Sequence, residues 1–143
     1  MGPLIDSSVL IAAAISARGA ARDLILYGIG GELALVVSEL VLVETERNLL
    51  LKAPAAFPAF EAFRAALGAE LADPGKVLVL RVAKVIEVKD APIVAAAIRA
   101  KADYLATYDR RHLLNIRDQI RDAFGVAVAM PDEILRQEKM EGR

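Results

Sequence analysis

Cysteine is absent from the sequence, and histidine occurs once among its 143 residues. The lack of cysteine excludes a disulfide framework and thiolate metal sites, and it favours a cytoplasmic protein. A single histidine excludes a zinc site built from several histidines. No apolar run approaches the roughly 18 residues that span a bilayer, so no membrane association is expected. The amino-terminal stretch has no basic segment and is interrupted by Asp6, so we do not expect a signal peptide.

Neither sign of charge dominates the sequence. The formal net charge is -1 and the isoelectric point is about 5.9, whereas a domain that binds nucleic acid is usually strongly basic. An enzyme that turns over nucleic acid can bring its positive charge as metal ions, so a nuclease is not excluded. The G-x-G-x-x-G and P-loop patterns of nucleotide-binding proteins are both missing. Hydrophobic residues make up 56% of the chain and the mean hydropathy is +0.41, which excludes a disordered chain.

Apolar runs typical of buried strands alternate with helical patterns along the sequence. Strands are expected at residues 2–5, 33–37, 104–107 and 126–129, with one or two more within 77–88. Helices are expected at residues 9–17, 20–29, 39–52, 59–71, 90–101 and 113–123, and from Pro131 onward. Ser7 or Ser8 is expected to cap the first helix, and Ser38 the third.

This alternation predicts one α/β domain over residues 1–143. Its central sheet would be mostly parallel, with 4–5 strands and helices on both faces. Residues 139–143 are expected to form a frayed tail.

Four acidic residues fall where the expected strands end or the following helices begin. Asp6 follows the first strand and Asp109 the strand at 104–107, whereas Asp90 precedes a helix and Glu44 lies inside one. Ligands of an open parallel sheet collect beyond the carboxyl ends of its strands, so these side chains should converge there. Crowded carboxylates raise one another's pKa unless a cation binds. Mg²⁺ or Mn²⁺ prefers such oxygen ligands, and one or two ions can activate water against a phosphodiester.

Each acid also has a purely structural interpretation. Asp6 can favour a helix dipole, Asp90 can cap a helix, and Asp109 can be a turn residue. Glu44 is harder to explain in this way. It shares a helix face with Leu40 and Leu51, and that face is predicted to be buried, where a carboxylate needs a partner.

Basic residues and the histidine cluster after the last of these acids. Arg110 and Arg111 follow Asp109, so they can contact an RNA backbone or simply lie on a solvated surface. For His112, a surface or capping role is favoured over contact with phosphate.

Three segments resemble the PIN-domain nucleases, and in particular the small stand-alone members that act as VapC-like toxins. The segments are L-I-D-S-S-V-L-I-A-A at 4–13, S-E-L-V-L-V-E-T-E-R-N-L at 38–49 and D-A-P-I-V-A-A-A-I-R-A-K-A-D-Y-L-A-T-Y-D-R-R-H-L at 90–113. The long third segment is the most specific. Two positions depart from the family pattern: Glu87 stands where many relatives carry Asp, and Tyr108 where many carry Gly.

The resemblance implies a Mg²⁺- or Mn²⁺-dependent ribonuclease. The catalytic and metal-binding residues would be Asp6, Glu44, Asp90 and Asp109. Ser7 or Ser8 would support the loop around the metal, and Thr107 would orient Asp109 or a water. The family further implies an RNA substrate, a homodimer and, for a toxin, an antitoxin partner.

Two other functions remain open from the sequence. One is a catalytically inactive domain of the same fold that binds RNA or protein as a scaffold. The other is a phosphorelay receiver-like domain, which also carries clustered acids and a strand-end Thr. In a receiver, however, Glu44 is unexplained, Asp6 has no neighbouring acid, and no lysine follows a late strand at the expected place.

Overall fold

The computed structural model describes residues 2–68 and 70–141. Five strands form one parallel sheet in the order β3-β2-β1-β4-β5. Their bounds are β1 (Leu4–Ile5), β2 (Val36–Ser38), β3 (Glu70–Ala72), β4 (Tyr104–Ala106) and β5 (Ala127–Ala129). The first strand is therefore central, and the chain order reverses between β1 and β4. The predicted α/β fold is confirmed, and the sheet is parallel throughout.

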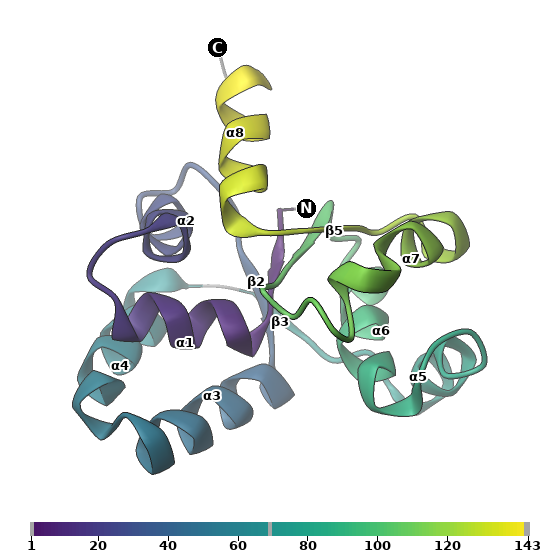
Figure 1. Ribbon diagram of the computed structural model, residues 1–143, viewed down its shortest axis with the longest axis horizontal. Helices are drawn as coiled ribbons and strands as arrows, with labels where there is room; N and C mark the ends of the chain where they lie inside the picture. The colour runs from purple at the N-terminus through teal and green to yellow at the C-terminus, as the bar shows by residue number, and fades with distance from the viewer. Residues whose placement is uncertain (1, 69, 142–143) are drawn as a thin grey trace.

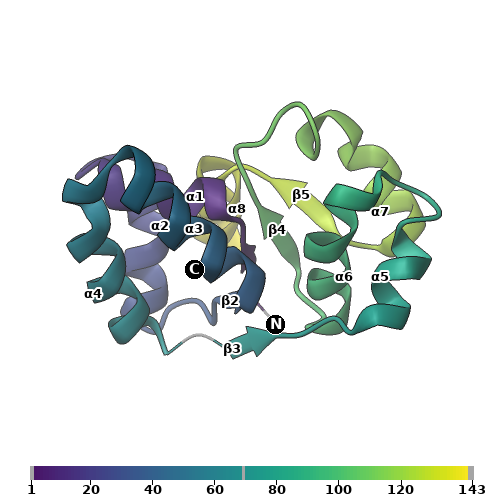
Figure 2. The ribbon, with the colours of Figure 1, turned by 90° about the horizontal axis from the view of Figure 1, so that it is seen from below.

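Eight α-helices surround this sheet within the described residues. They are α1 (Ser7–Ile15), α2 (Ala20–Ile29), α3 (Glu39–Lys52), α4 (Phe57–Leu67), α5 (Lys76–Val82), α6 (Ala91–Arg99), α7 (Arg117–Phe124) and α8 (Pro131–Glu141). Figure 1 shows α1 to α4 on one side of the sheet and α5 to α7 on the other. Figure 2 shows the same two groups from below.

The core has two halves because successive strand residues point to opposite faces of the sheet. Ile5 and Ala106 pack into the half that α1 to α4 and α8 cover. Leu4 and Leu105 pack into the half formed with α5, α6 and α7. Both faces of the central strands are therefore buried, which matches their continuous apolar sequences.

Helix starts and stops are set by local residues, and one prediction about them was wrong. Asp6, not Ser7 or Ser8, caps α1, because its side chain accepts a hydrogen bond from the Ser7 amide. Ser38 caps α3 as predicted, and its hydroxyl accepts from the Val41 amide. Gly68 follows α4 in the left-handed conformation, with φ at +55°, which stops the helix at little steric cost.

Two segments differ from the prediction. Residues 77–88 form no strand: they hold α5 and the start of a 3-10 turn (Val88–Asp90). The helix expected at 59–71 is α4, which begins and ends earlier, and the edge strand β3 follows it. The buried residues Val82 and Ile86 explain the first error. They are four residues apart, which is the helical period, although the β-branched composition favours a strand.

The carboxyl-terminal helix is longer than expected. Residues 139–141 are helical and belong to α8, and their fraying stays a prediction. Residues 142–143 lie outside the described part of the chain. Within residues 2–68 and 70–141, no helix is long and apolar enough to cross a membrane.

Candidate active site

A cavity of about 390 Å³ opens at the carboxyl ends of the central strands. It lies where the strand order reverses between β1 and β4, which is the usual ligand position in an open α/β sheet. All four acids singled out from the sequence line it: Asp6, Glu44, Asp90 and Asp109. Ser7, Ser8 and Tyr108 also contribute to its wall.

Asp6 is the most buried of these acids, with 9% of its surface exposed. One carboxylate oxygen, Oδ1, accepts a hydrogen bond of 2.8 Å from the Ser7 amide. The other, Oδ2, accepts from the Ser8 hydroxyl at 2.9 Å and the Thr107 hydroxyl at 2.7 Å. These donors fix the carboxylate in one orientation, and Oδ1, which accepts a single bond, keeps accepting capacity for a further ligand.

Thr107 and Ser8 join the ends of two neighbouring strands. The buried Thr107 hydroxyl accepts the Asp109 amide at 2.9 Å while it donates to Asp6. The Ser8 hydroxyl accepts the Tyr108 amide at 3.0 Å. Both hydroxyls therefore act as orienting groups between the segments after β1 and β4. Ser7 takes part only through its backbone amide among the bonds described here.

Asp90 does not cap α6, although it occupies the N-cap position, because its side chain makes no capping hydrogen bond. Its carboxylate lies 3.7 Å from Nδ1 of His112 and its side chain is 12% exposed. Burial raises the pKa of Asp90, whereas the charges of His112 and Lys89 act to lower that pKa. The structural interpretation of Asp90 as a helix cap therefore loses its main support.

Glu44 lines the cavity, but the reason given for it from the sequence was wrong. The buried face of α3 consists of Val41, Thr45 and Leu49. Leu40 and Leu51 are 48% and 75% exposed, and Glu44 itself is exposed. The cavity walls still desolvate its carboxylate enough to raise its pKa, and the negative charge of Asp6 adds to that rise.

Asp109 begins the turn after β4. Its carboxylate accepts the His112 amide at 3.0 Å, and its carbonyl accepts the amides of Leu113 and Leu114. Asp109 is therefore a turn residue and a cavity residue at once. The two roles are compatible because only Oδ1 of the carboxylate bonds within the turn, and Oδ2 is left for a ligand in the cavity.

Neither of the two arginines lines the acid cavity. Arg110 lines a separate small cavity and contacts the sulfur of Met130, whereas Arg111 is exposed and does not line the acid cavity. The basic residue that does line it is Lys89, which the sequence reasoning did not name. Its position next to Asp90 is the one signal that could have identified it.

The donor set of the cavity suits a divalent cation. Within the described residues, no lysine or arginine forms an ion pair with any of the four carboxylates. Hard oxygen ligands without a lysine or arginine in direct contact are the chemistry that Mg²⁺ or Mn²⁺ would complete. Because Mg²⁺ keeps several waters, not every carboxylate has to touch the ion.

The most compact group of possible metal ligands in the described chain is not made of these four acids. That group is Glu87, Asp90 and His112, whose ligand atoms all lie within 4.8 Å of one another. It shares Asp90 with the acid cavity and sits at its rim. The four acids are spaced more widely, which fits ligation partly through water.

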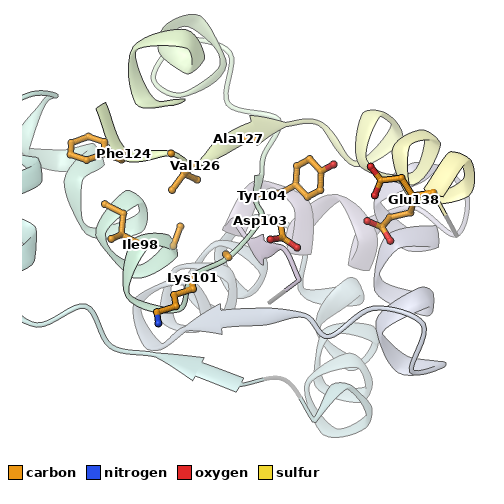
Figure 3. A pocket seen from close by; sticks show the side chains of 12 residues that line it. Ile98, Lys101, Asp103, Tyr104, Phe124, Val126, Ala127 and Glu138 are labelled. Atoms are coloured by element: carbon orange, nitrogen blue, oxygen red, sulfur yellow. The ribbon is translucent and has the colours of Figure 1, made fainter. Parts of the chain in front are cut away.

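A larger cavity of about 690 Å³ lies at the opposite edge of the sheet. Lys101, Tyr104 and Glu138 line it, near the amino ends of β4 and β5 (Figure 3). None of the four acids reaches this cavity, although it is the larger of the two. The acid cavity is the better candidate for a reaction site because it lies at the carboxyl ends of the strands and two of its carboxylates have raised pKa values.

Comparisons with known proteins agree with this geometry. No curated protein matches the sequence. The crystal structure of PAE2754 from Pyrobaculum aerophilum is similar, with a TM-score of 0.65, 22% identity, and coverage of 95% of this chain and 88% of that one. At that identity the likeness concerns the fold. The sequence matches the PIN domain family over residues 4–118. This match spans most of the chain and includes all four acids, so the chain belongs to the PIN domain family, within a superfamily of metal-dependent nucleases.

Proposed function

We propose that the protein is an endoribonuclease that hydrolyses phosphodiester bonds with bound Mg²⁺ or Mn²⁺. The observation that carries the proposal is the acid cavity, where four carboxylates without a lysine or arginine partner line one space at the carboxyl edge of the sheet. The chain's membership of the PIN domain family supports the same class of reaction, the hydrolysis of phosphodiester bonds.

The four acids, Asp6, Glu44, Asp90 and Asp109, would hold one or two ions. When bound there, the metal would supply an activated water and offset the charge that develops on the leaving oxygen. The raised pKa of Glu44 suits its carboxylate to accept the proton of the attacking water. Thr107 and Ser8 keep the Asp6 carboxylate oriented toward the cavity.

The decisive test is the pair of substitutions Asp6→Asn and Asp90→Asn. Each removes one charge at nearly constant shape, so we expect Mn²⁺-dependent cleavage of RNA to fall by at least a hundredfold while circular dichroism stays unchanged. Asp122→Asn, on the exposed side of α7, is the matched control and should retain activity. Undiminished cleavage by either cavity variant would refute the assignment.

A titration separates this proposal from the alternative of an inactive scaffold. Calorimetry with Mn²⁺ should show binding to the wild-type chain and weaker binding to Asp6→Asn. No heat of binding at millimolar metal, together with retained affinity for RNA, would favour the scaffold.

We further propose that the protein works in the cytoplasm, either as the toxin of a toxin–antitoxin pair or as an RNA-processing nuclease. Induced expression of a toxin should arrest growth of its host, and the Asp6→Asn variant should not. Rescue by a small protein encoded beside it would identify the antitoxin. Growth arrest by the wild type and by Asp6→Asn alike would argue against a nuclease toxin.

A homodimer is proposed on the basis of α3. This helix exposes Leu40, Val43, Leu50 and Leu51, and a monomer gains nothing from such an apolar row. Light scattering should give about twice the 15.3 kDa of one chain. Leu51→Glu should lower that mass to a monomer's, because a charge in the interface is costly. A wild-type monomer at micromolar concentration would contradict the proposal.

A further inference from the structure

The four carboxylates of the acid cavity are unfavourable for binding a negatively charged substrate, and a bound metal ion offsets only part of their charge. These carboxylates repel a polyanionic substrate, so a cation of the protein would favour binding of a phosphate next to the reacting one. Of the described residues that line the cavity, Lys89 is the one with a basic side chain. This inference rests on the proposed nuclease function and concerns how its substrate is held.

The Lys89 ammonium is held by two residues outside the four acids. Its Nζ lies 3.3 Å from Nε2 of His112 and 4.0 Å from Oε2 of Glu87. The other ring nitrogen of His112, Nδ1, lies 3.7 Å from the Asp90 carboxylate. One ring nitrogen of His112 therefore faces the Lys89 ammonium and the other faces the Asp90 carboxylate. His112 thus links Lys89 to the cavity acid beside it.

This arrangement also accounts for the compact donor group at the rim. Glu87, Asp90 and His112 bring their ligand atoms within 4.8 Å of one another, and the Lys89 ammonium already contacts two of the three. A cation of the protein therefore lies against this group. The side chain of Lys89 remains 60% exposed, so its ammonium has free donors for an incoming anion.

We propose that Lys89, aligned by His112, binds a backbone phosphate of the RNA beside the acid cavity and so positions the strand for cleavage. Lysine contacts phosphate as a point charge that every nucleotide sequence offers equally. Lys89 is therefore a positioning residue for substrate, and it contributes to affinity without selecting a base.

The test compares Lys89→Met, Lys89→Arg and Lys101→Met with the wild type. Lys101 lies in the cavity at the opposite edge of the sheet (Figure 3), so its substitution gives the same charge change away from the acids. Cleavage of a random-sequence single-stranded 20-mer RNA pool is measured with Mn²⁺ to obtain kcat and KM. Binding of the same labelled pool is measured by anisotropy with Ca²⁺, at several salt concentrations, after gels confirm that the RNA stays intact.

Lys89→Met should raise KM and the dissociation constant by tenfold to a hundredfold, as expected for the loss of one charged hydrogen bond, with kcat within a few-fold of wild type. The slope of log affinity against log salt should become shallower by about 0.7, which corresponds to one phosphate contact on a single strand. Lys89→Arg should restore both quantities, and Lys101→Met should match the wild type. His112→Ala should produce part of the Lys89→Met effect.

Three results would overturn the inference, and they differ in what they say of the nuclease. If wild type and Lys89→Met cleave and bind alike with equal salt slopes, Lys89 does not hold the substrate and the proposed nuclease still stands. If Lys89→Met lowers kcat alone with no change in salt slope, its role is structural. If the wild type neither binds nor cleaves the RNA pool with Mn²⁺, the proposed function and this inference fail together.

Discussion

At the scale of single residues, the site depends on the Thr107 and Ser8 hydroxyl groups, which orient the Asp6 carboxylate. Thr107 is fully buried and bonds both to the Asp6 carboxylate and to the Asp109 amide. Ser8 adds a second donor to the same carboxylate. Such partners orient the groups that bind metal, and their loss commonly costs tenfold to a hundredfold in affinity or activity.

Thr107→Val should therefore reduce metal-dependent cleavage by about tenfold to a hundredfold. Stability should fall by about 1–3 kcal/mol, because buried polar partners lose their bond. Thr45→Val is the control: Thr45 is equally buried and bonds to the Val41 carbonyl within α3. Kinetics and urea unfolding of both variants check the contrast. Equal activity in the two variants would show that Thr107 only supports the fold.

Asp90→Asn should make the metal-free protein more stable at neutral pH. The pKa of Asp90 is raised, chiefly by burial, so the folded state favours the neutral carboxyl. The stability that this group contributes is present below its ordinary pKa of about 3.9 and is lost as pH rises through the raised value.

Thermal melting in chelator, from pH 3 to pH 8, measures this effect. Asp90→Asn should have the higher Tm at pH 7 and approach the wild-type Tm at pH 3. Asp122→Asn, on the surface, should change the Tm little at either pH. A lower Tm of Asp90→Asn at pH 7 would contradict the expected sign.

That the four acids line one cavity was easier to predict than the surroundings of each acid. Asp6 and Asp109 follow from strand ends, and both line the cavity. For Glu44 the sequence indicated a buried face, whereas α3 buries the neighbouring row and exposes Leu51. An apolar residue on a helix reveals its face only when the packing partner is known, because surfaces also carry leucines.

At the scale of elements, α2 packs very closely against side chains of the later segments of the chain. A Cβ on Gly28 would lie 2.3 Å from Cδ1 of Leu35 and 2.9 Å from Cδ2 of Leu67. Leu35 is buried at 4% exposure, so it has little room to move. The glycine permits this approach at a cost in helix propensity of about 1 kcal/mol.

Gly28→Ala should accordingly destabilise the protein, since overpacking typically costs about 1–3 kcal/mol and the gain in propensity offsets only part of it. The penalty should shrink in a Leu35→Ala background, where only the 2.9 Å approach to Cδ2 of Leu67 remains. A double-mutant cycle by urea unfolding measures this coupling. If Gly28→Ala has the same effect in both backgrounds, the close contact is not the cause.

Helix α5 is the element that local sequence predicted worst. Val and Leu dominate Lys76–Val82, and the β-branched residues among them favour strands. Tertiary packing decides otherwise, because Val82 and Ile86 fill the half of the core next to α6. By contrast, α2 and α3 were predicted well, since Gly30 and Ser38 mark their ends chemically.

At the scale of the whole molecule, metal binding should be linked to folding. A ligand that binds only the folded state adds about 2.7 kcal/mol when its concentration is a hundred times its dissociation constant. Mn²⁺ should therefore raise the Tm of the wild type by several degrees, and chelator should reverse the rise. Asp6→Asn should respond less to the metal. An equal rise in both proteins would mean that the ion binds elsewhere.

The overall fold could be inferred from the alternation of elements, but the strand order could not. Pairing of Leu4 with Leu105 joins residues from distant parts of the sequence, and no local pattern encodes that neighbour. Edge strand β3 was missed because Glu70 and Leu71 were assigned to the end of the helix expected at 59–71, which in fact ends at Leu67. Short strands in a parallel sheet are fixed by their neighbours more than by their own composition.

The central position of β1 has a consequence for synthesis on the ribosome. Asp6 emerges first, yet its partner Thr107 is made 101 residues later, and Asp109 follows still later. Any nascent chain shorter than that lacks part of the acid set, and β4 cannot pair with β1 until it has left the exit tunnel. The order of translation thus keeps the acid cavity incomplete until β4 and the segment that follows it have been made.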